Sequence, residues 1–191
     1  MSSFRKIFYN IQSIQKKRFP LLDQEKYKLL NIQNKCSEYL FEEIFSIDEL
    51  KLLAKNISDQ IKKSDVILLK GQLGSGKTTF AKFLVSALSG KEEIVQSPTF
   101  NLVLTYGLKN YTVWHFDLYR LSNIEEVWDL GIDEAISNGV SVIEWPEIIQ
   151  EFFKENYLEI IFSHVDLNDS RMISIKCFGD WVGRLSKLKR E

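Results

Sequence analysis

The sequence contains little cysteine and no long apolar run. Its two cysteines, Cys36 and Cys177, lie far apart and form no C-x-x-C pair, which favours free thiols in a reducing compartment. No apolar stretch approaches the length of a membrane span, and none resembles the apolar region of a secretory signal. We therefore expect a soluble cytoplasmic protein that does not associate with membranes.

Acidic residues are absent from the beginning of the chain. No Asp or Glu precedes Asp23, and residues 1–40 hold eight of the 25 Lys and Arg residues but only three of the 26 Asp and Glu residues. We expect a basic N-terminal extension over 1–40, partly helical or mobile, ahead of one domain over 41–191. An arm that contacts RNA or another polyanion, and an organelle-targeting segment, are the less favoured alternatives for this extension.

The most informative stretch is Gly71–Thr78, which reads Gly-Gln-Leu-Gly-Ser-Gly-Lys-Thr and matches the phosphate-binding pattern G-x-x-x-x-G-K-[ST]. An apolar, β-branched run, Val66–Leu69, precedes it, and a helix-like stretch, Thr79–Leu88, follows it. A strand, a glycine loop and a helix are the setting that this motif requires. The sequence therefore predicts a nucleotide-binding loop between a strand and a helix.

Each part of this loop has a predicted task. Glycines allow the backbone to approach a ligand closely, and the N–H groups at the helix N-terminus favour a phosphate chain. We predict that Lys77 binds the β- and γ-phosphates and takes part in catalysis, and that the Thr78 hydroxyl binds Mg²⁺. The predicted ATP contacts of the loop are Gly71, Leu73, Gly74, Ser75, Gly76, Lys77, Thr78 and Thr79.

Two carboxylates at the ends of predicted strands are candidates for metal and water chemistry. Glu144 follows the apolar run Val140–Ile143, and Asp117 follows the predicted strand Tyr111–Phe116. A phosphate loop needs a carboxylate from a neighbouring strand to hold hydrated Mg²⁺. We predict that Glu144 binds the metal and that Asp117 is catalytic, orienting water or binding the metal through water. For either residue, the alternative is a helix cap or an ion pair with Arg120.

Four further residues are placed near the nucleotide on local grounds. We predict a catalytic role for Thr99, in Ser-Pro-Thr, as a switch that senses the γ-phosphate, although the same residues also form ordinary turns. Ser46 and Glu49 form a capping-box pattern at the start of the first domain helix. Because this element lies directly before the strand of the phosphate loop, we predict Phe45 and Ser46 on the adenine side. Trp145 is predicted as an ATP contact, with a place in the core as the favoured alternative.

Three absences from the sequence restrict the nucleotide, the reaction and the metal ligands that we expect. The only Asn-Lys pair, Asn34–Lys35, lacks the Asp typical of GTP-specific proteins and precedes the phosphate loop, which favours ATP. Arg120 is the only arginine between the loop and Arg171, whereas small-molecule kinases usually carry arginines on a mobile lid. His115 and His164 form no metal-binding spacing with cysteine, so we expect both to be structural.

Five short motifs, in this order along the chain, resemble those of the TsaE family of bacterial P-loop ATPases. They are Gly71–Thr79, Ser97–Phe100, His115–Leu121, Glu125–Gly131 and Ile143–Glu147. The likeness extends from Phe45 to about Phe178, and Gln72 stands where the family usually carries Asp. It implies an α/β fold, a three-layer P-loop NTPase-like sandwich in which helices flank a central sheet. Leu158–Phe162 and Met172–Ile175 are predicted as late antiparallel strands.

The resemblance also implies a function. Members of the family support the threonylcarbamoylation of adenosine 37 in tRNA through slow, Mg²⁺-dependent ATP hydrolysis. The implied partners are the threonylcarbamoyl transferase and its inactive paralogue-like companion, which the ATPase binds and resets, with tRNA as an indirect partner. The alternatives are a nucleotide-gated interaction module with incidental hydrolysis and, less favoured, a small-molecule kinase.

Overall fold

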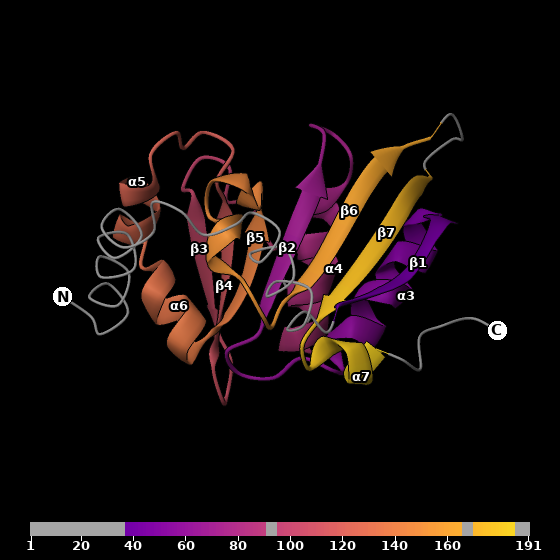
Figure 1. Ribbon diagram of the computed structural model, residues 1–191, viewed down its shortest axis with the longest axis horizontal. Helices are drawn as coiled ribbons and strands as arrows, with labels where there is room; N and C mark the ends of the chain where they lie inside the picture. The colour runs from indigo at the N-terminus through magenta and orange to yellow at the C-terminus, as the bar shows by residue number, and fades with distance from the viewer. Residues whose placement is uncertain (1–36, 91–94, 166–169, 186–191) are drawn as a thin grey trace, which may run out of the picture. The chain divides into compact units, whose positions relative to one another are not determined.

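A seven-stranded mixed sheet organises the residues that the computed structural model describes, which are 37–90, 95–165 and 170–185 (Figure 1). The strands lie in the order β1-β7-β6-β2-β5-β4-β3. They are β1 (Ser37–Phe45), β2 (Val66–Gly71), β3 (Val103–Gly107), β4 (Thr112–Asp117), β5 (Val140–Glu144), β6 (Leu158–His164) and β7 (Arg171–Phe178). Residues 1–36, and the predictions that concern them, lie outside the described residues.

The middle of the sheet is parallel. β2 pairs in parallel with β5 and β6, and β4 pairs in parallel with β5, while β3, β7 and β1 form antiparallel pairs. The four apolar residues Val66–Leu69 of β2 are at most 2% exposed, as expected for a central parallel strand that is covered on both faces. Because β2, β4 and β5 are parallel, their carboxyl ends meet at one edge of the sheet.

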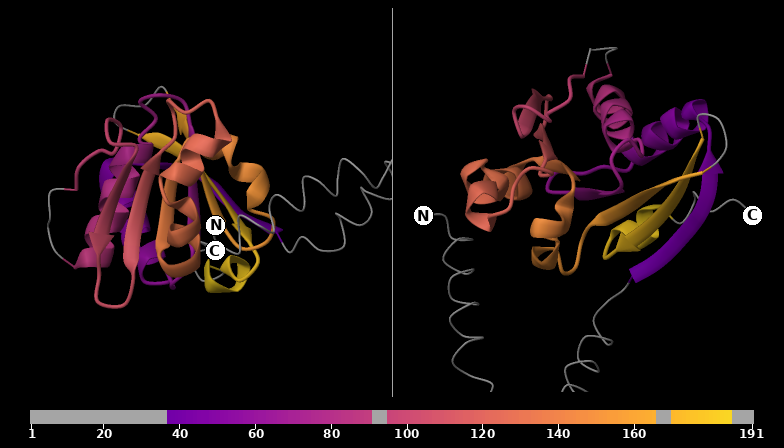
Figure 2. Two further views of the ribbon diagram at one scale, coloured as in Figure 1. Left: turned by 90° about the vertical axis from the view of Figure 1, so that its left-hand side faces the viewer. Right: turned by 90° about the horizontal axis from the view of Figure 1, so that it is seen from above.

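Helices cover both faces of the sheet (Figure 2). They are α3 (Ile47–Ser58), α4 (Lys77–Ser89), α5 (Ile124–Asp129), α6 (Ile132–Asn138) and α7 (Trp181–Leu185), with the short 3-10 helices η1 (Pro146–Ile148) and η2 (Gln150–Phe152). The predicted capping box is present, since the Ser46 side chain accepts from the Glu49 N–H and the Glu49 carboxylate accepts from the Ser46 N–H. None of the described helices combines the length and apolar character needed to cross a bilayer.

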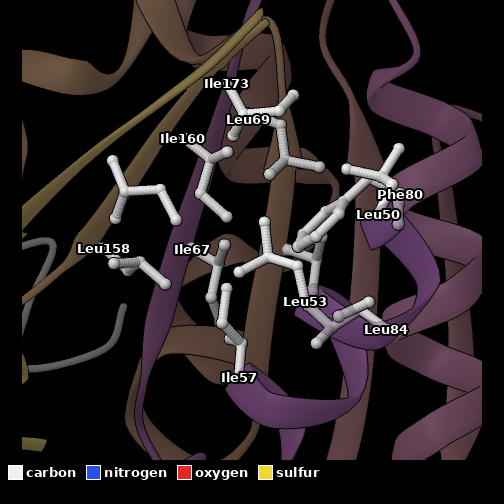
Figure 3. Close-up of a cluster of buried hydrophobic side chains, with 14 of the residues drawn as sticks. Leu50, Leu53, Ile57, Ile67, Leu69, Phe80, Leu84, Leu158, Ile160 and Ile173 are labelled. Atoms are coloured by element: carbon white, nitrogen blue, oxygen red, sulfur yellow. The ribbon is translucent and has the colours of Figure 1, made fainter. Parts of the chain in front are cut away.

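The side chains of β2 divide between two hydrophobic clusters. Ile67 and Leu69 pack toward α3 and α4, where Phe80 and Leu84 are fully buried (Figure 3). Val66 and Leu68 belong to the opposite cluster, to which α5 and α6 contribute. This alternation follows from the two-residue period of a strand, and it confirms the predicted three-layer α/β sandwich with its central sheet.

The structure confirms one predicted pair of strands and adds one strand that was not predicted. β6 and β7 confirm the late antiparallel pair. β1 was not predicted, and it begins at Ser37, ahead of residue 41 where the domain was expected to start. It pairs with β7 over its length, with Phe45 opposite Arg171. Its sequence, Ser-Glu-Tyr-Leu-Phe-Glu-Glu-Ile-Phe, lacks a clean alternation of apolar and polar residues, so this strand depends on its distant partner.

The buried face of α4 gives a test of the core. Replacing Leu84, which is fully buried between α4 and the sheet, with Ala removes contacts and leaves a cavity, so we expect a loss of about 2–5 kcal/mol in the free energy of unfolding. Leu52→Ala is the matched control, because Leu52 on α3 is 56% exposed and its loss is expected to change stability by less than about 0.5 kcal/mol. Urea unfolding followed by circular dichroism measures both, and equal losses would contradict this packing.

Candidate nucleotide-binding site

The phosphate loop joins the end of β2 to the start of α4. Gly71 has a φ of 136° and Gly76 a φ of 105°, and residues with a Cβ rarely adopt such backbone angles. A Cβ on Gly71 would lie 2.3 Å from the carbonyl oxygen of Phe162 on β6. α4 begins at Lys77 without a side-chain cap, so its first backbone N–H groups and the positive end of its dipole are available to an anion.

Lys77 lies against the loop carbonyls and an aromatic ring. Its ammonium donates to the carbonyl oxygens of Gly71 at 2.8 Å and Gln72 at 2.9 Å, and it lies 3.9 Å from the centroid of the Trp145 ring. Burial lowers the pKa of Lys77, and the carboxylate of Glu144 is the largest of the opposing influences. Trp145 is only half-buried and its ring lies tilted against that of Tyr119, so the favoured alternative, a place in the core, is wrong.

Glu144 connects β5 to the first turn of α4. Thr78 Oγ1 donates to Glu144 Oε2 at 2.7 Å, although the two residues are 66 positions apart in the sequence. The other carboxylate oxygen, Oε1, lies 2.8 Å from Nε2 of His115 on β4. Glu144 is 1% exposed, so these contacts compensate for burying its charge. The residue predicted to bind Mg²⁺ from the loop and the predicted carboxylate ligand are thus in direct contact.

Asp117 connects β4 to the loop that carries Thr99. Thr99 Oγ1 donates to Asp117 Oδ2 at 2.8 Å, and the backbone N–H of Tyr119 donates to Oδ1 at 3.1 Å. Asp117 is the parallel register partner of Glu144, which places both carboxylates at the same edge of the sheet. Arg120 lies with its guanidinium 5.1 Å from the Phe100 ring centroid, so its contact is aromatic.

Most of the predicted site residues surround one cavity of about 190 Å³. Its lining comprises Leu73, Gly74, Gly76, Lys77, Thr78, Thr79, Thr99, Asp117, Tyr119, Glu144 and Trp145. Gly71 and Ser75 belong to the loop but do not line this cavity, since Ser75 is buried and the Gly71 carbonyl accepts from Lys77.

A second cavity of about 240 Å³ adjoins the first, because Gly76 and Thr79 line both. Its other lining residues are Phe45, Ser46, Ile47, Leu50 and Arg171. Phe45 and Ser46, predicted on the adenine side, are therefore beside the phosphate loop but separate from the cavity that holds Lys77.

Three residues near the site escaped the sequence-based prediction. Tyr119 lines the first cavity, and its ring is tilted by 44° against that of Trp145 with ring centroids 4.6 Å apart. Arg171 reaches the second cavity from the start of β7, where it pairs with His164 on β6 and with Phe45 on β1. His115 was expected to be structural, but it contacts the predicted metal ligand Glu144. Its position two residues before Asp117 on one strand was the available signal, since alternate residues share a face.

The chemistry of the oxygen donors fits Mg²⁺. A hydroxyl from Thr78 and a carboxylate from Glu144 are hard ligands, and Mg²⁺ usually takes one or two carboxylates and completes its shell with water and phosphate oxygens. Among the described residues, no three His, Cys, Asp or Glu side chains gather in a way that would hold a metal by themselves. The arrangement thus suits a metal that arrives together with phosphates.

The fold and the loop define the class of protein. The glycine loop leads from a buried central strand into a helix, and a carboxylate from the neighbouring parallel strand meets the first helical turn. The fold is that of the P-loop NTPases. The crystal structure of Bacillus subtilis YdiB is similar, with a TM-score of 0.61 and 27% sequence identity over 81% of this chain and 95% of that one.

The family follows from comparison with known sequences. The sequence model of the family "Threonylcarbamoyl adenosine biosynthesis protein TsaE" matches residues 44–173, and the chain belongs to this family. The tRNA threonylcarbamoyladenosine biosynthesis protein TsaE of Rickettsia conorii is 40% identical over 130 residues, which cover 68% of this chain and 74% of that protein. The protein of the same name from Bacillus subtilis is 36% identical over 134 residues, or 70% and 82% of the two chains.

The tight contact at Gly71 gives a test of the loop. In Gly71→Ala the new methyl group meets the Phe162 carbonyl and the backbone keeps an unfavourable φ, so we expect a loss of more than about 1 kcal/mol in the free energy of unfolding. Gly107→Ala is the control, since a Cβ there meets no atom within 4 Å. Calorimetry measures the thermal unfolding midpoint of both variants. Equal midpoints would show that the close approach of Phe162 does not require glycine at position 71.

Proposed function

We propose that this protein is a Mg²⁺-dependent ATPase that acts in tRNA threonylcarbamoyladenosine biosynthesis, where it binds and resets the threonylcarbamoyl transferase complex. The observation that carries the proposal is the contact between Thr78 and Glu144 in the cavity that Lys77 also lines. This contact supports the proposal because a metal held by these two residues would lie close to the lysine expected to bind phosphate. The place in tRNA modification rests on membership of the TsaE family and on the names of the relatives.

The two adjoining cavities suggest how ATP lies. The triphosphate occupies the cavity around the phosphate loop, where α4 offers its N–H groups and Lys77 offers its positive charge. The adenosine part lies in the second cavity, whose apolar wall includes Phe45 and whose polar groups include Ser46 and Arg171. A planar base suits a pocket with one apolar wall and a few polar groups.

Asp117 is the group best placed to act on the attacking water. It lines the same cavity as the phosphate loop, and its two oxygens are held by Thr99 and by the Tyr119 N–H. A carboxylate fixed in this way accepts a hydrogen bond from water and directs it at the γ-phosphate. Lys77 stabilises the charge that develops on the phosphate oxygens. Mg²⁺, held by Thr78 and Glu144, adds further stabilisation of that charge.

The loop that carries Thr99 offers a route for control by a partner. Phe100, the next residue, is 85% exposed, and Thr99 itself holds the Asp117 carboxylate. A protein that binds and shifts this loop therefore changes the orientation of the catalytic carboxylate. This coupling supports hydrolysis that is slow alone and faster in the presence of the transferase and its inactive paralogue-like companion.

The metal role of Glu144 is tested by Glu144→Gln, which keeps the shape of the side chain and removes its charge. We expect Mg²⁺-dependent ATP hydrolysis to fall at least about 100-fold, while binding of ATP in the presence of EDTA persists. Glu147→Gln is the matched control, because Glu147 is exposed and acts on Lys77 only through its charge. A Glu144→Gln protein with wild-type turnover would exclude Glu144 from the metal site.

The catalytic role of Asp117 is tested by Asp117→Asn, which removes the acceptor charge. We expect turnover to fall about 10²–10⁴-fold with little change in ATP affinity, and the residual rate to respond weakly to the transferase pair and tRNA. Asp59→Asn is the control, since Asp59 is 55% exposed at the end of α3. If Asp117→Asn abolishes hydrolysis yet restores tRNA modification in cells that lack the protein, then ATP acts as a gate for an interaction module and its hydrolysis is incidental.

A further inference from the structure

The imidazole of His115 is fully buried on the face of β4 that carries Asp117. It does not line either cavity, so it has no direct contact with the space proposed for ATP. Burying a polar ring in a sheet is unfavourable unless the ring forms a hydrogen bond. Its contact is with Glu144, at 2.8 Å between Nε2 and Oε1.

The chemistry of this contact fixes the direction of the hydrogen bond. An ionised carboxylate only accepts, so Nε2 of His115 carries the hydrogen and donates it to Glu144. The other ring nitrogen, Nδ1, is buried and has no hydrogen-bond partner among the described residues. The ring thus has one polar contact with this part of the protein, and that contact is directed at Glu144.

Together, His115 and Thr78 hold both oxygens of Glu144. Thr78 donates to Oε2 and His115 donates to Oε1, from two different elements of the fold. A single hydrogen bond leaves a glutamate free to turn about its last torsion, which has a broad preference. Two donors on opposite oxygens fix the plane of the carboxylate, so that Oε2 faces the Thr78 hydroxyl.

We propose that His115 is a positioning residue for the metal site: it orients the Glu144 carboxylate so that Oε2 is presented to Mg²⁺ beside Thr78. This inference rests on the proposed function, because it assumes that Glu144 serves Mg²⁺·ATP. Carboxylates that bind metals are commonly fixed by a hydrogen bond from a residue that does not touch the metal, and loss of such a residue typically weakens metal affinity or activity about 10–100-fold.

The test compares His115→Gln with His115→Asn. A Gln side chain places its amide N–H where Nε2 of the imidazole lies, whereas the Asn side chain is one carbon shorter and does not reach Glu144. The readout is equilibrium binding of a fluorescent, non-hydrolysable ATP analogue as a function of Mg²⁺ concentration. We expect the half-saturating Mg²⁺ concentration to rise about 10–100-fold in His115→Asn and to stay near the wild-type value in His115→Gln. Binding of the analogue in EDTA stays unchanged in both variants.

Val142→Ala is the matched control, because Val142 is the buried, apolar register partner of His115 on β5. It is expected to lower the unfolding midpoint and leave the Mg²⁺ dependence intact. Equal Mg²⁺ dependence in the Gln and Asn variants would overturn the positioning role. Wild-type binding that does not depend on Mg²⁺ would instead overturn the proposed function, and this inference with it.

The ring nitrogen signals of the ¹⁵N-labelled wild-type protein give a check that does not depend on the stability of any variant. A His115 ring that carries its hydrogen on Nε2 supports the proposal. A neutral ring that carries its hydrogen only on Nδ1 cannot donate to Glu144 and would overturn it.

Discussion

The hydrogen bond between Thr78 and Glu144 ties the phosphate loop to the neighbouring strand, and the geometry of the site depends on it. The bond exists because β2 and β5 are parallel neighbours, so that their carboxyl ends, and the helix that follows β2, lie at one edge of the sheet. β4 pairs with β5 in the same direction and brings Asp117 beside Glu144. Strand pairing thus places a lysine, a hydroxyl and two carboxylates around one cavity, with no need for a long loop.

The charges in this cavity favour a divalent cation with a phosphate chain. Lys77, Asp117 and Glu144 are each at most 5% exposed, which is unusual for charged side chains. Two carboxylates face one ammonium, so the buried group has an excess of negative charge that Mg²⁺ would offset. The phosphates in turn bring negative charge to Lys77 and to the N–H groups of α4. We therefore expect that Mg²⁺ and the nucleotide each raise the affinity of the protein for the other.

The parts of the site that could be predicted from the sequence are encoded by local patterns. The parts that were not predicted depend on contacts between distant segments. The glycine loop, the capping box at Ser46 and the two strand-ending carboxylates are each encoded within a few residues, so the sequence was sufficient for them. β1 depends on pairing with β7 across more than a hundred residues, and no local pattern marks it or the position of Arg171 opposite Phe45. Trp145 was predicted as an ATP contact with the core as the favoured alternative, and its left-handed backbone, with a φ of 55°, accompanies a position that lines the cavity beside Lys77.

The central claim is that Thr78, Glu144 and Lys77 form one site for Mg²⁺ and ATP. A crystal structure of the protein with Mg²⁺ and a non-hydrolysable ATP analogue tests it most directly. We expect the metal on the Thr78 hydroxyl, next to the Glu144 carboxylate, and the γ-phosphate between Lys77 and Asp117. A nucleotide bound elsewhere, or a metal that leaves Glu144 in contact with neither the ion nor its water shell, would contradict the account.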